Sequence, residues 1–276
     1  MTNAARPQDS PDLSGQQQPG PDQTPLDEDV TAALLVIGDE ILSGRTKDRN
    51  IGYLAEQLTR VGVRLREVRV VADDETAIVT AVNALRTAYT YVFTTGGIGP
   101  THDDITAGAI AKAFDVPIDV DERALALMRP YYEKRGLELT PSRLRMARIP
   151  KGARLIRNSI SIAPGFQLGN VIVMAGVPEI MQVMLDEALR HLRTGRRMLS
   201  ESIVVSAPEG DIADMFADHQ SEFPDIAMGS YPKFTADGLR CELVLRSIDA
   251  EGLRKALDSL CRKLDDRRIP CSKSNT

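Results

Sequence analysis

The chain contains little cysteine and no long apolar stretch, the features that mark disulfide-rich proteins and membrane proteins. Its cysteines, Cys241, Cys261 and Cys271, are odd in number and do not have the spacing of metal ligands. No apolar stretch is long enough for a signal peptide or a membrane helix. The scarcity of cysteine argues against a disulfide framework. Together these absences predict a soluble protein of a reducing, cytoplasmic compartment, with no membrane partner.

Positive charge is also in short supply. The chain has 34 Lys and Arg against 39 Asp and Glu, a formal net charge of -5 with a pI near 5.4. This balance argues against a nucleic-acid partner, because a protein that binds nucleic acid needs a basic patch on its surface. One short basic cluster, Arg190, Arg193, Arg196 and Arg197, is interpreted as the solvated end of a helix.

The 276 residues divide by composition and pattern. Residues 1–29 are rich in proline and polar residues, so they cannot repay the entropy of ordering and are predicted to form a disordered tail. Alternating strand and helix patterns in residues 30–197 predict an α/β domain with a mostly parallel sheet covered on both faces. Residues 198–268 follow a β-α-β-β-α order typical of a small α+β domain. Residues 269–276 are expected to be a C-terminal tail.

A glycine-rich turn is the most informative motif of the chain. An apolar strand leads directly into Gly96, Gly97 and Gly99, and Asp104 follows. Glycines allow successive backbone amides to converge on an anion, and the following helix would add its positive end. A dinucleotide fingerprint would need glycine in place of His102, and the Gly-Lys-Ser/Thr of a P-loop is absent. The turn therefore predicts a phosphate site of another kind.

Two further turns, Gly38-Asp39-Glu40 and Gly176-Val177-Pro178, follow predicted strands and are expected at the same edge of the sheet. Ligands of such sheets bind at this edge, where the carboxyl ends of the strands lie. Carboxylates repel phosphate unless a cation lies between them, so Asp39 and Asp104 are candidate ligands of a divalent metal. In the small domain, Ser230, Tyr231 and Lys233 supply a hydroxyl, an aromatic ring and an ammonium, which would suit a nucleotide or flavin. A hairpin connection between two strands explains this segment equally well. The candidate ligand-binding residues are Gly38, Asp39, Glu40, Ser43, Gly96, Gly97, Gly99, Thr101, Gly176, Pro178, Ser230, Tyr231 and Lys233.

Several of these polar residues have ordinary structural explanations as well. Asp48 and Asn50 precede a helical pattern, and capping is the favoured role for Asn50. His102 could be a general base, a metal ligand or a loop histidine without a role. Thr101 is expected to contact phosphate through its hydroxyl. Asp104 is favoured as functional because it follows the glycine turn.

Two long motifs carry a family resemblance. Gly38-Asp-Glu-Ile-Leu-Ser-Gly44 and Thr95-Gly-Gly-Ile-Gly-Pro-Thr-His-Asp-Asp-Ile-Thr106 resemble the MoaB/Mog molybdopterin-binding domain family. The nearest branches are the N-terminal domain of CinA and the molybdopterin-binding-like domain of FAD synthases. The resemblance implies a three-layer α/β/α fold, a homo-oligomer that is a dimer or trimer, and essential acidic residues at Asp104 and Asp74. Spacing alone does not single out Asp74.

The resemblance also implies the chemistry. In the CinA and FAD-synthase branches it indicates a pyrophosphohydrolase acting on ADP-ribose or FAD with Mg²⁺, Mn²⁺ or Co²⁺, and a monovalent cation is a further candidate cofactor. Asp104, Asp74 and His102 are its candidate catalytic residues. Glu179 stands where CinA proteins carry a serine, as in the FAD-synthase branch. The alternatives are a molybdopterin-binding protein without turnover and a regulatory or assembly module whose C-terminal domain recruits a partner.

Overall fold

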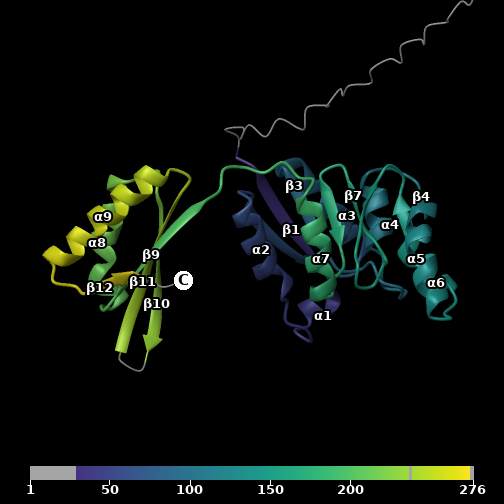
Figure 1. Cartoon of the computed structure of the whole chain (residues 1–276), viewed down its shortest axis with the longest axis horizontal. Coiled ribbons are helices and arrows are strands. Elements are labelled where there is room, and N and C mark those ends of the chain that lie inside the picture. The colour runs from purple at the N-terminus through teal and green to yellow at the C-terminus, as the bar shows by residue number, and fades with distance from the viewer. Residues whose placement is uncertain (1–28, 236–237, 274–276) are drawn as a thin grey trace, which may run out of the picture.

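The structure is a computed structural model that describes residues 29–235 and 238–273. The chain forms a larger N-terminal part around one sheet and a smaller C-terminal part around another (Figure 1). The predicted N-terminal tail, apart from Asp29, lies outside the described residues. Within the described residues, every helix is too short or too polar to cross a lipid bilayer.

The larger sheet is mixed and mostly parallel. Its strand order is β2-β1-β3-β8-β7-β6. Strands β2, β1, β3 and β8 pair in parallel, and β7 pairs antiparallel with both β8 and β6. The strands are β1 (Thr31–Ile37), β2 (Arg64–Val71), β3 (Tyr91–Thr95), β6 (Arg154–Ile156), β7 (Gly165–Leu168) and β8 (Val171–Met174). All residues of β1 after Thr31 are buried, which explains its unbroken apolar sequence. The predicted α/β fold class is confirmed.

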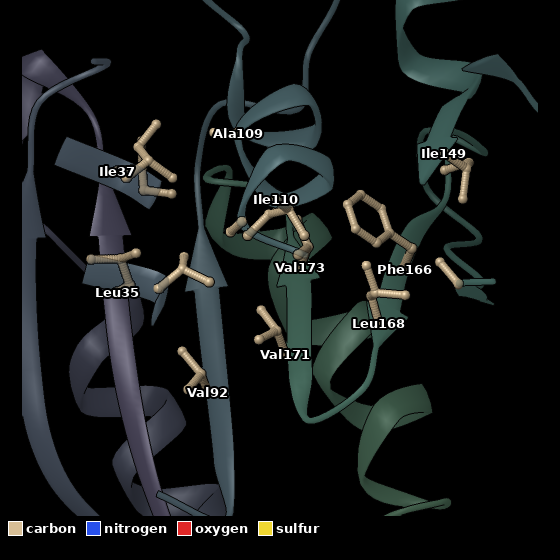
Figure 2. Close-up of a cluster of buried hydrophobic side chains, with 14 of the residues drawn as sticks. Leu35, Ile37, Val92, Ala109, Ile110, Ile149, Phe166, Leu168, Val171 and Val173 are labelled. Carbon is tan, nitrogen blue, oxygen red and sulfur yellow. The ribbon is translucent and has the colours of Figure 1, made fainter. Parts of the chain in front are cut away.

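Helices cover both faces of this sheet and create two separate cores. One core joins the sheet to α3, α4 and α5, and the other joins it to α2 and α7. Figure 2 shows the first core, in which Ile110 of α4 and Phe166 of β7 pack with valines of β3 and β8. The helices are α1 (Asp39–Leu42), α2 (Asn50–Arg60), α3 (Glu75–Ala88), α4 (Thr106–Ala113), α5 (Glu122–Lys134), α6 (Pro141–Leu144), α7 (Pro178–Leu189) and the short η1 (Arg145–Ala147); β4 (Ile118–Val120) and β5 (Arg148–Pro150) form a separate ribbon.

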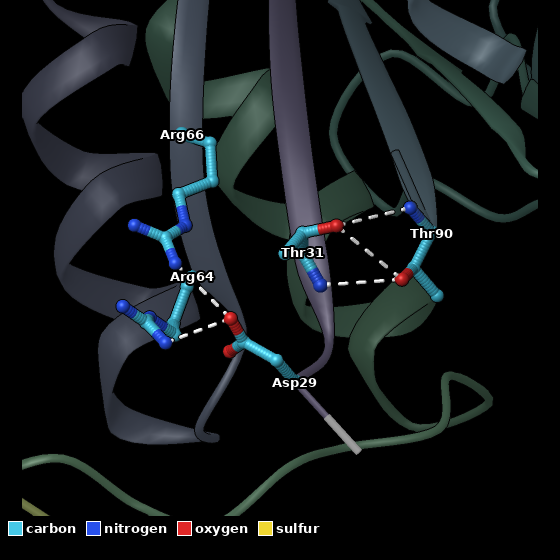
Figure 3. Close-up of polar contacts among 5 residues, drawn as sticks. All are labelled: Asp29, Thr31, Arg64, Arg66 and Thr90. Carbon is cyan, nitrogen blue, oxygen red and sulfur yellow. Dashed lines mark hydrogen bonds and ion pairs between the residues drawn. The ribbon is translucent and has the colours of Figure 1, made fainter. Parts of the chain in front are cut away.

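Polar contacts fix the start of β1 against its neighbours (Figure 3). The Asp29 carboxylate accepts hydrogen bonds from Arg64 at 2.7 Å and Arg66 at 3.1 Å, both on β2. Burial opposes ionisation of Asp29, but these hydrogen bonds outweigh it and lower the pKa of the carboxyl. On the other side, the Thr31 amide donates to the Thr90 hydroxyl at 3.2 Å. These contacts support the register of β1 between β2 and β3.

The small domain has its own antiparallel sheet and its own core. Its strand order is β10-β11-β9-β12, and two helices pack against it. Its elements are β9 (Leu199–Val205), α8 (Glu209–Glu222), β10 (Ala227–Thr235), β11 (Gly238–Ser247), α9 (Ala250–Asp266) and β12 (Cys271–Lys273). The strand β12 corrects the expectation that residues 269–276 are a tail, because Cys271–Lys273 pairs with the end of β9. A strand of three residues is too short to show a pattern in sequence.

A buried histidine joins the two helices of the small domain. His219 of α8 has no exposed surface, and its Nε2 donates to the carbonyl oxygen of Ala256 in α9 at 3.0 Å. Its ring packs on Phe223 with centroids 4.9 Å apart. Burial lowers the pKa of His219, with a smaller contribution from nearby Lys263, while Ala256 and Glu222 oppose the shift. The ring is therefore neutral in the folded state near neutral pH.

This burial predicts that the small domain loses stability on mild acidification. Because the pKa of His219 is lower in the folded than in the unfolded chain, the free energy of unfolding is highest above the unfolded value of about 6.5. It falls as pH drops below that value, since the unfolded chain then binds a proton that the folded domain excludes. Urea denaturation between about pH 7.5 and about pH 5.5 would measure the slope. His219→Gln should flatten it, whereas the control His191→Gln, at an exposed position, should not. An unchanged slope in His219→Gln would contradict the assignment.

Candidate functional site

Three turns meet at the edge of the sheet where β1, β3 and β8 end. The amide of Gly96 donates to the carbonyl of Met174 at 3.2 Å. A Cβ added to Gly96 would lie 2.0 Å from the carbonyl oxygen of Ile37, and one added to Gly176 would lie 3.3 Å from the Cα of Gly96. Gly96 also has a φ of 103°, which side chains rarely adopt. The structure thus brings together the three turns that the sequence placed at one edge.

Asp104 closes the glycine turn from within. Its Oδ2 accepts hydrogen bonds from the amide of Thr101 at 2.8 Å and from the Thr101 hydroxyl at 2.6 Å. A Cβ added to Gly99 would lie 2.6 Å from the same oxygen, so the carboxylate lies directly against the loop backbone. The Thr101 hydroxyl, expected to contact phosphate, here contacts Asp104. Asp104 therefore shapes the loop, and any ligand role is additional to that.

Asp73 is the acidic residue that sequence reasoning missed. Its Oδ2 accepts a hydrogen bond from the Asp39 amide at 3.0 Å, and its Oδ1 would lie 3.6 Å from a Cβ on Gly97. Burial raises the pKa of Asp73, and the negative charges of Asp39, Glu40 and Asp103 add to the shift, which the Asp39 amide partly opposes. A carboxyl with a raised pKa beside a glycine turn is a candidate proton acceptor.

The neighbouring Asp74 has a different position. It is the N-cap of α3, and its side chain accepts a hydrogen bond from the amide of Ala77 at 2.8 Å. The catalytic role that the family resemblance implies for Asp74 stays a prediction. A pair of aspartates after a strand was the available signal in sequence, because one member caps the helix and leaves the other for the site.

The carboxylates do not complete a metal site by themselves. Among the described residues, no three side chains of His, Cys, Asp or Glu gather into a group that could hold a metal ion. Asp39 and Asp104, the predicted metal ligands, would need oxygen ligands from elsewhere. No catalytic step through a metal follows from this arrangement.

The other predicted residues of these turns are placed as follows. The side chain of His102 is 98% exposed, and its Nδ1 lies 3.9 Å from Oδ1 of Asp103. The carboxylate of Glu40 lies over Gly38, within 2.6 Å of where a Cβ would be. Ser43 ends α1 through its amide, which donates to the carbonyl of Asp39 at 2.8 Å. Pro178 begins α7, where its missing N–H has no consequence.

The capping expectation for Asn50 is wrong. Asp48 caps α2 instead, with its Oδ1 accepting from the amides of Asn50 at 2.9 Å and Ile51 at 2.7 Å. The side chain of Asn50 is buried and donates to the carbonyl of Gly176 at 2.8 Å. Asn50 therefore holds the third turn, a contact between residues 126 positions apart that local sequence does not reveal.

The predicted ligand residues of the small domain lie on another sheet. Ser230, Tyr231 and Lys233 belong to β10, which lies in the C-terminal part of the chain, apart from the glycine turn (Figure 1). The Ser230 hydroxyl donates to the carboxylate of Glu209, and the Lys233 ammonium pairs with Glu242 at 2.7 Å. Their role in ligand binding stays a prediction.

Buried polar atoms without partners collect around the glycine turn. Among the described residues, these atoms include Asn50 Oδ1, Thr94 Oγ1, Thr95 Oγ1, Thr106 Oγ1 and Arg145 Nε. Thr94 and Thr95 end β3, and Thr106 Oγ1 would lie 2.2 Å from a Cβ on Gly97. Each unsatisfied buried group costs about 1–3 kcal/mol, so proteins retain such groups mainly where water, an ion or a ligand satisfies them.

A cavity of about 20 Å³ opens beside the turn. Gly97, Gly99 and Asp104 line it together with Arg145, Arg148 and several apolar side chains. Its size suits a water molecule, so a larger ligand would cover its mouth. The two arginines were not singled out from the sequence, because η1 and β5 are too short to show a pattern and lie far from the glycine turn in the chain.

Comparisons with known proteins agree with this architecture. A family model described as "Probable molybdopterin binding domain" matches residues 33–194, and one described as "FAD synthase, middle domain" matches residues 197–271. A protein of Pyrobaculum arsenaticum is 34% identical over 88% of this chain and 95% of its own length. A "Probable FAD synthase" of Caenorhabditis elegans is 33% identical over 83% of this chain, which spans 49% of that protein. The crystal structure of a CinA protein of unknown function from Thermoplasma acidophilum aligns with a TM-score of 0.54 and 36% identity, covering 59% of this chain and 98% of that one.

The contact between the first two turns predicts a large effect of a single methyl group. Gly96→Ala should lower the free energy of unfolding by about 2–4 kcal/mol, because the new Cβ would meet the Ile37 carbonyl in a strained backbone. Gly108→Ala is the matched control, since a Cβ at that position in α4 has no neighbour within 4 Å. It should raise stability by about 0.5–1 kcal/mol. Urea denaturation of both variants tests the pair, and equal effects would contradict the close approach.

Proposed function

Because the chain belongs to the "Probable molybdopterin binding domain" family and continues into an FAD synthase-type middle domain, we propose that its glycine-turn site binds a nucleotide diphosphate and hydrolyses it. The observation that carries the proposal is the glycine turn at the ends of the central strands, where Gly97 and Gly99 line a cavity together with Arg145 and Arg148. Backbone amides and guanidinium groups are donors that phosphate oxygens would satisfy. The resemblance to CinA and FAD synthase supports a nucleotide as the class of ligand.

Asp73 is the residue that would remove a proton from water. Its raised pKa makes it a stronger base than an ordinary carboxylate, and its contact with Asp39 holds it beside Gly97. The water oxygen would attack phosphorus while its proton passes to Asp73. The bridging P–O bond would break, and the second phosphate would leave with the bond's electron pair. The amides of the glycine turn would stabilise the charge that develops on the attacked phosphate.

The proposed hydrolysis also requires a divalent cation. When bound, Mg²⁺, Mn²⁺ or Co²⁺ would neutralise the repulsion between phosphate and the carboxylates of Asp39 and Asp104. These two residues supply too few ligands alone, so phosphate oxygens and water would have to complete the coordination.

Pterin binding without turnover is the second candidate. The description of the matching family favours it, and the lack of a gathered metal site among the described residues is consistent with a site that only binds. Molybdopterin carries a phosphate that the same turn could hold. Pterin fluorescence that co-purifies with wild-type protein and is lost in Asp104→Ala would support this candidate.

The hydrolytic proposal predicts turnover that depends on Asp73. With Mg²⁺, Mn²⁺ or Co²⁺, purified protein should cleave at least one of FAD, ADP-ribose and NAD into two monophosphates, which a coupling phosphatase then converts to measurable inorganic phosphate. Asp73→Asn should lower kcat about a hundredfold or more, because the amide cannot accept the proton. Asp225→Asn, an exposed position in the small domain, is the control and should retain wild-type turnover. Intact substrates under every metal condition, with folding verified, would refute hydrolysis.

A further inference from the structure

Two arginines line the same small cavity as the glycine turn. Arg145 lies in η1 and Arg148 begins β5, and Gly97, Gly99 and Asp104 line the cavity with them. The cavity therefore brings two arginines together with the glycine turn, and guanidinium groups and backbone amides are both donors that suit phosphate.

The guanidinium of Arg145 is largely free of protein partners. Its Nε is buried without a hydrogen bond, and its Nη2 makes a long bond of 3.3 Å to the carbonyl of His102. Within the described part of the chain, neither Arg145 nor Arg148 has a carboxylate within 4.0 Å, whereas Arg64 and Arg123 do. Asp103 is the nearby anion: a hydrogen bond from Thr101 lowers the pKa of its carboxyl, and the charge of Arg145 adds to the shift. An arginine stays charged in proteins, so its buried Nε without an acceptor is a costly arrangement unless water or a ligand supplies one.

The surroundings of the arginines would strengthen an anion contact. Apolar side chains of Met146, Ile149, Pro164 and Phe166 line the same cavity. Phe166 and Ile149 are buried, so they limit the water that can compete for the guanidinium groups. The bond to His102 also connects Arg145 to the loop that contains Asp104.

We propose that Arg145, assisted by Arg148, binds one phosphate of the ligand while the glycine turn holds the adjacent phosphate. The site would thereby select diphosphates over monophosphates. Resting on the proposed function, this inference identifies the substrate class as compounds with two linked phosphates. Arg145 is the specificity-determining residue because its charged guanidinium lines the cavity and its Nε has no protein hydrogen-bond partner. Arg148 is exposed and contributes mainly charge.

Binding of two adenosine probes tests the inference. Calorimetry would compare α,β-methylene-ADP, whose bridge resists hydrolysis, with AMP, each with and without Mg²⁺. Wild-type protein should bind the diphosphate analogue more tightly. Arg145→Gln should weaken its binding by about ten- to a hundredfold, the range of a lost charge-assisted hydrogen-bond pair, and leave AMP binding nearly unchanged. Arg145→Lys should recover only part of the loss, because an ammonium has no planar fork.

Arg129→Gln provides the control, since Arg129 is an exposed residue of α5 outside the cavity. It should keep the wild-type preference. An unchanged preference in Arg145→Gln and Arg145→Lys, with wild-type thermal unfolding, would overturn the inference, as would a wild-type protein that binds both probes equally or neither. Should Arg145→Gln fail to fold, the Arg145→Lys comparison decides.

The binding experiment separates this inference from the proposed hydrolysis. Diphosphate preference that depends on Arg145 in a protein without turnover would refute hydrolysis and retain the inference. Turnover in a protein whose preference for the diphosphate does not depend on Arg145 would retain hydrolysis and refute the inference.

Discussion

The site depends on the close approach of two backbone turns at the end of the central strands. Only the missing Cβ of Gly96 allows its backbone to pass the carbonyl of Ile37, where a Cβ would lie at 2.0 Å. That approach brings the turns after β1 and β3 together. Gly176, in the turn after β8, also lies close, because a Cβ added to it would be 3.3 Å from the Cα of Gly96. The buried strands beneath are packed on both faces, so the turns rest on a rigid base.

The site combines acidic and basic groups. Asp39 and Asp73 lie at the ends of β1 and β2, where their mutual proximity contributes to the raised pKa of Asp73. Arg145 and Arg148 line the cavity beside the glycine turn and belong to a segment outside the central sheet. In the proposed reaction, the acidic pair would supply the proton acceptor and the arginines would supply fixed positive charge for phosphate.

The small domain is a separate structural unit with its own hydrophobic core. Its residues that resemble ligand contacts, Ser230 and Lys233, already have carboxylate partners in Glu209 and Glu242. Among the described residues, the unpartnered buried polar atoms lie around the glycine turn of the large domain, except for Nδ1 of His219.

Burial patterns in the sequence were sufficient to predict the parallel sheet, because strands covered on both faces have to be apolar throughout. The glycine turn and Asp104 were also predictable, since turn glycines and the residues beside them act locally. Tertiary structure decided which acidic side chain faces the site: Asp74 caps a helix, whereas Asp73 meets Asp39. It also joined the side chain of Asn50 to Gly176 and placed Arg145 at the same cavity as Gly99. These contacts join residues far apart in the chain, and the direction of each side chain follows from packing that no local pattern records.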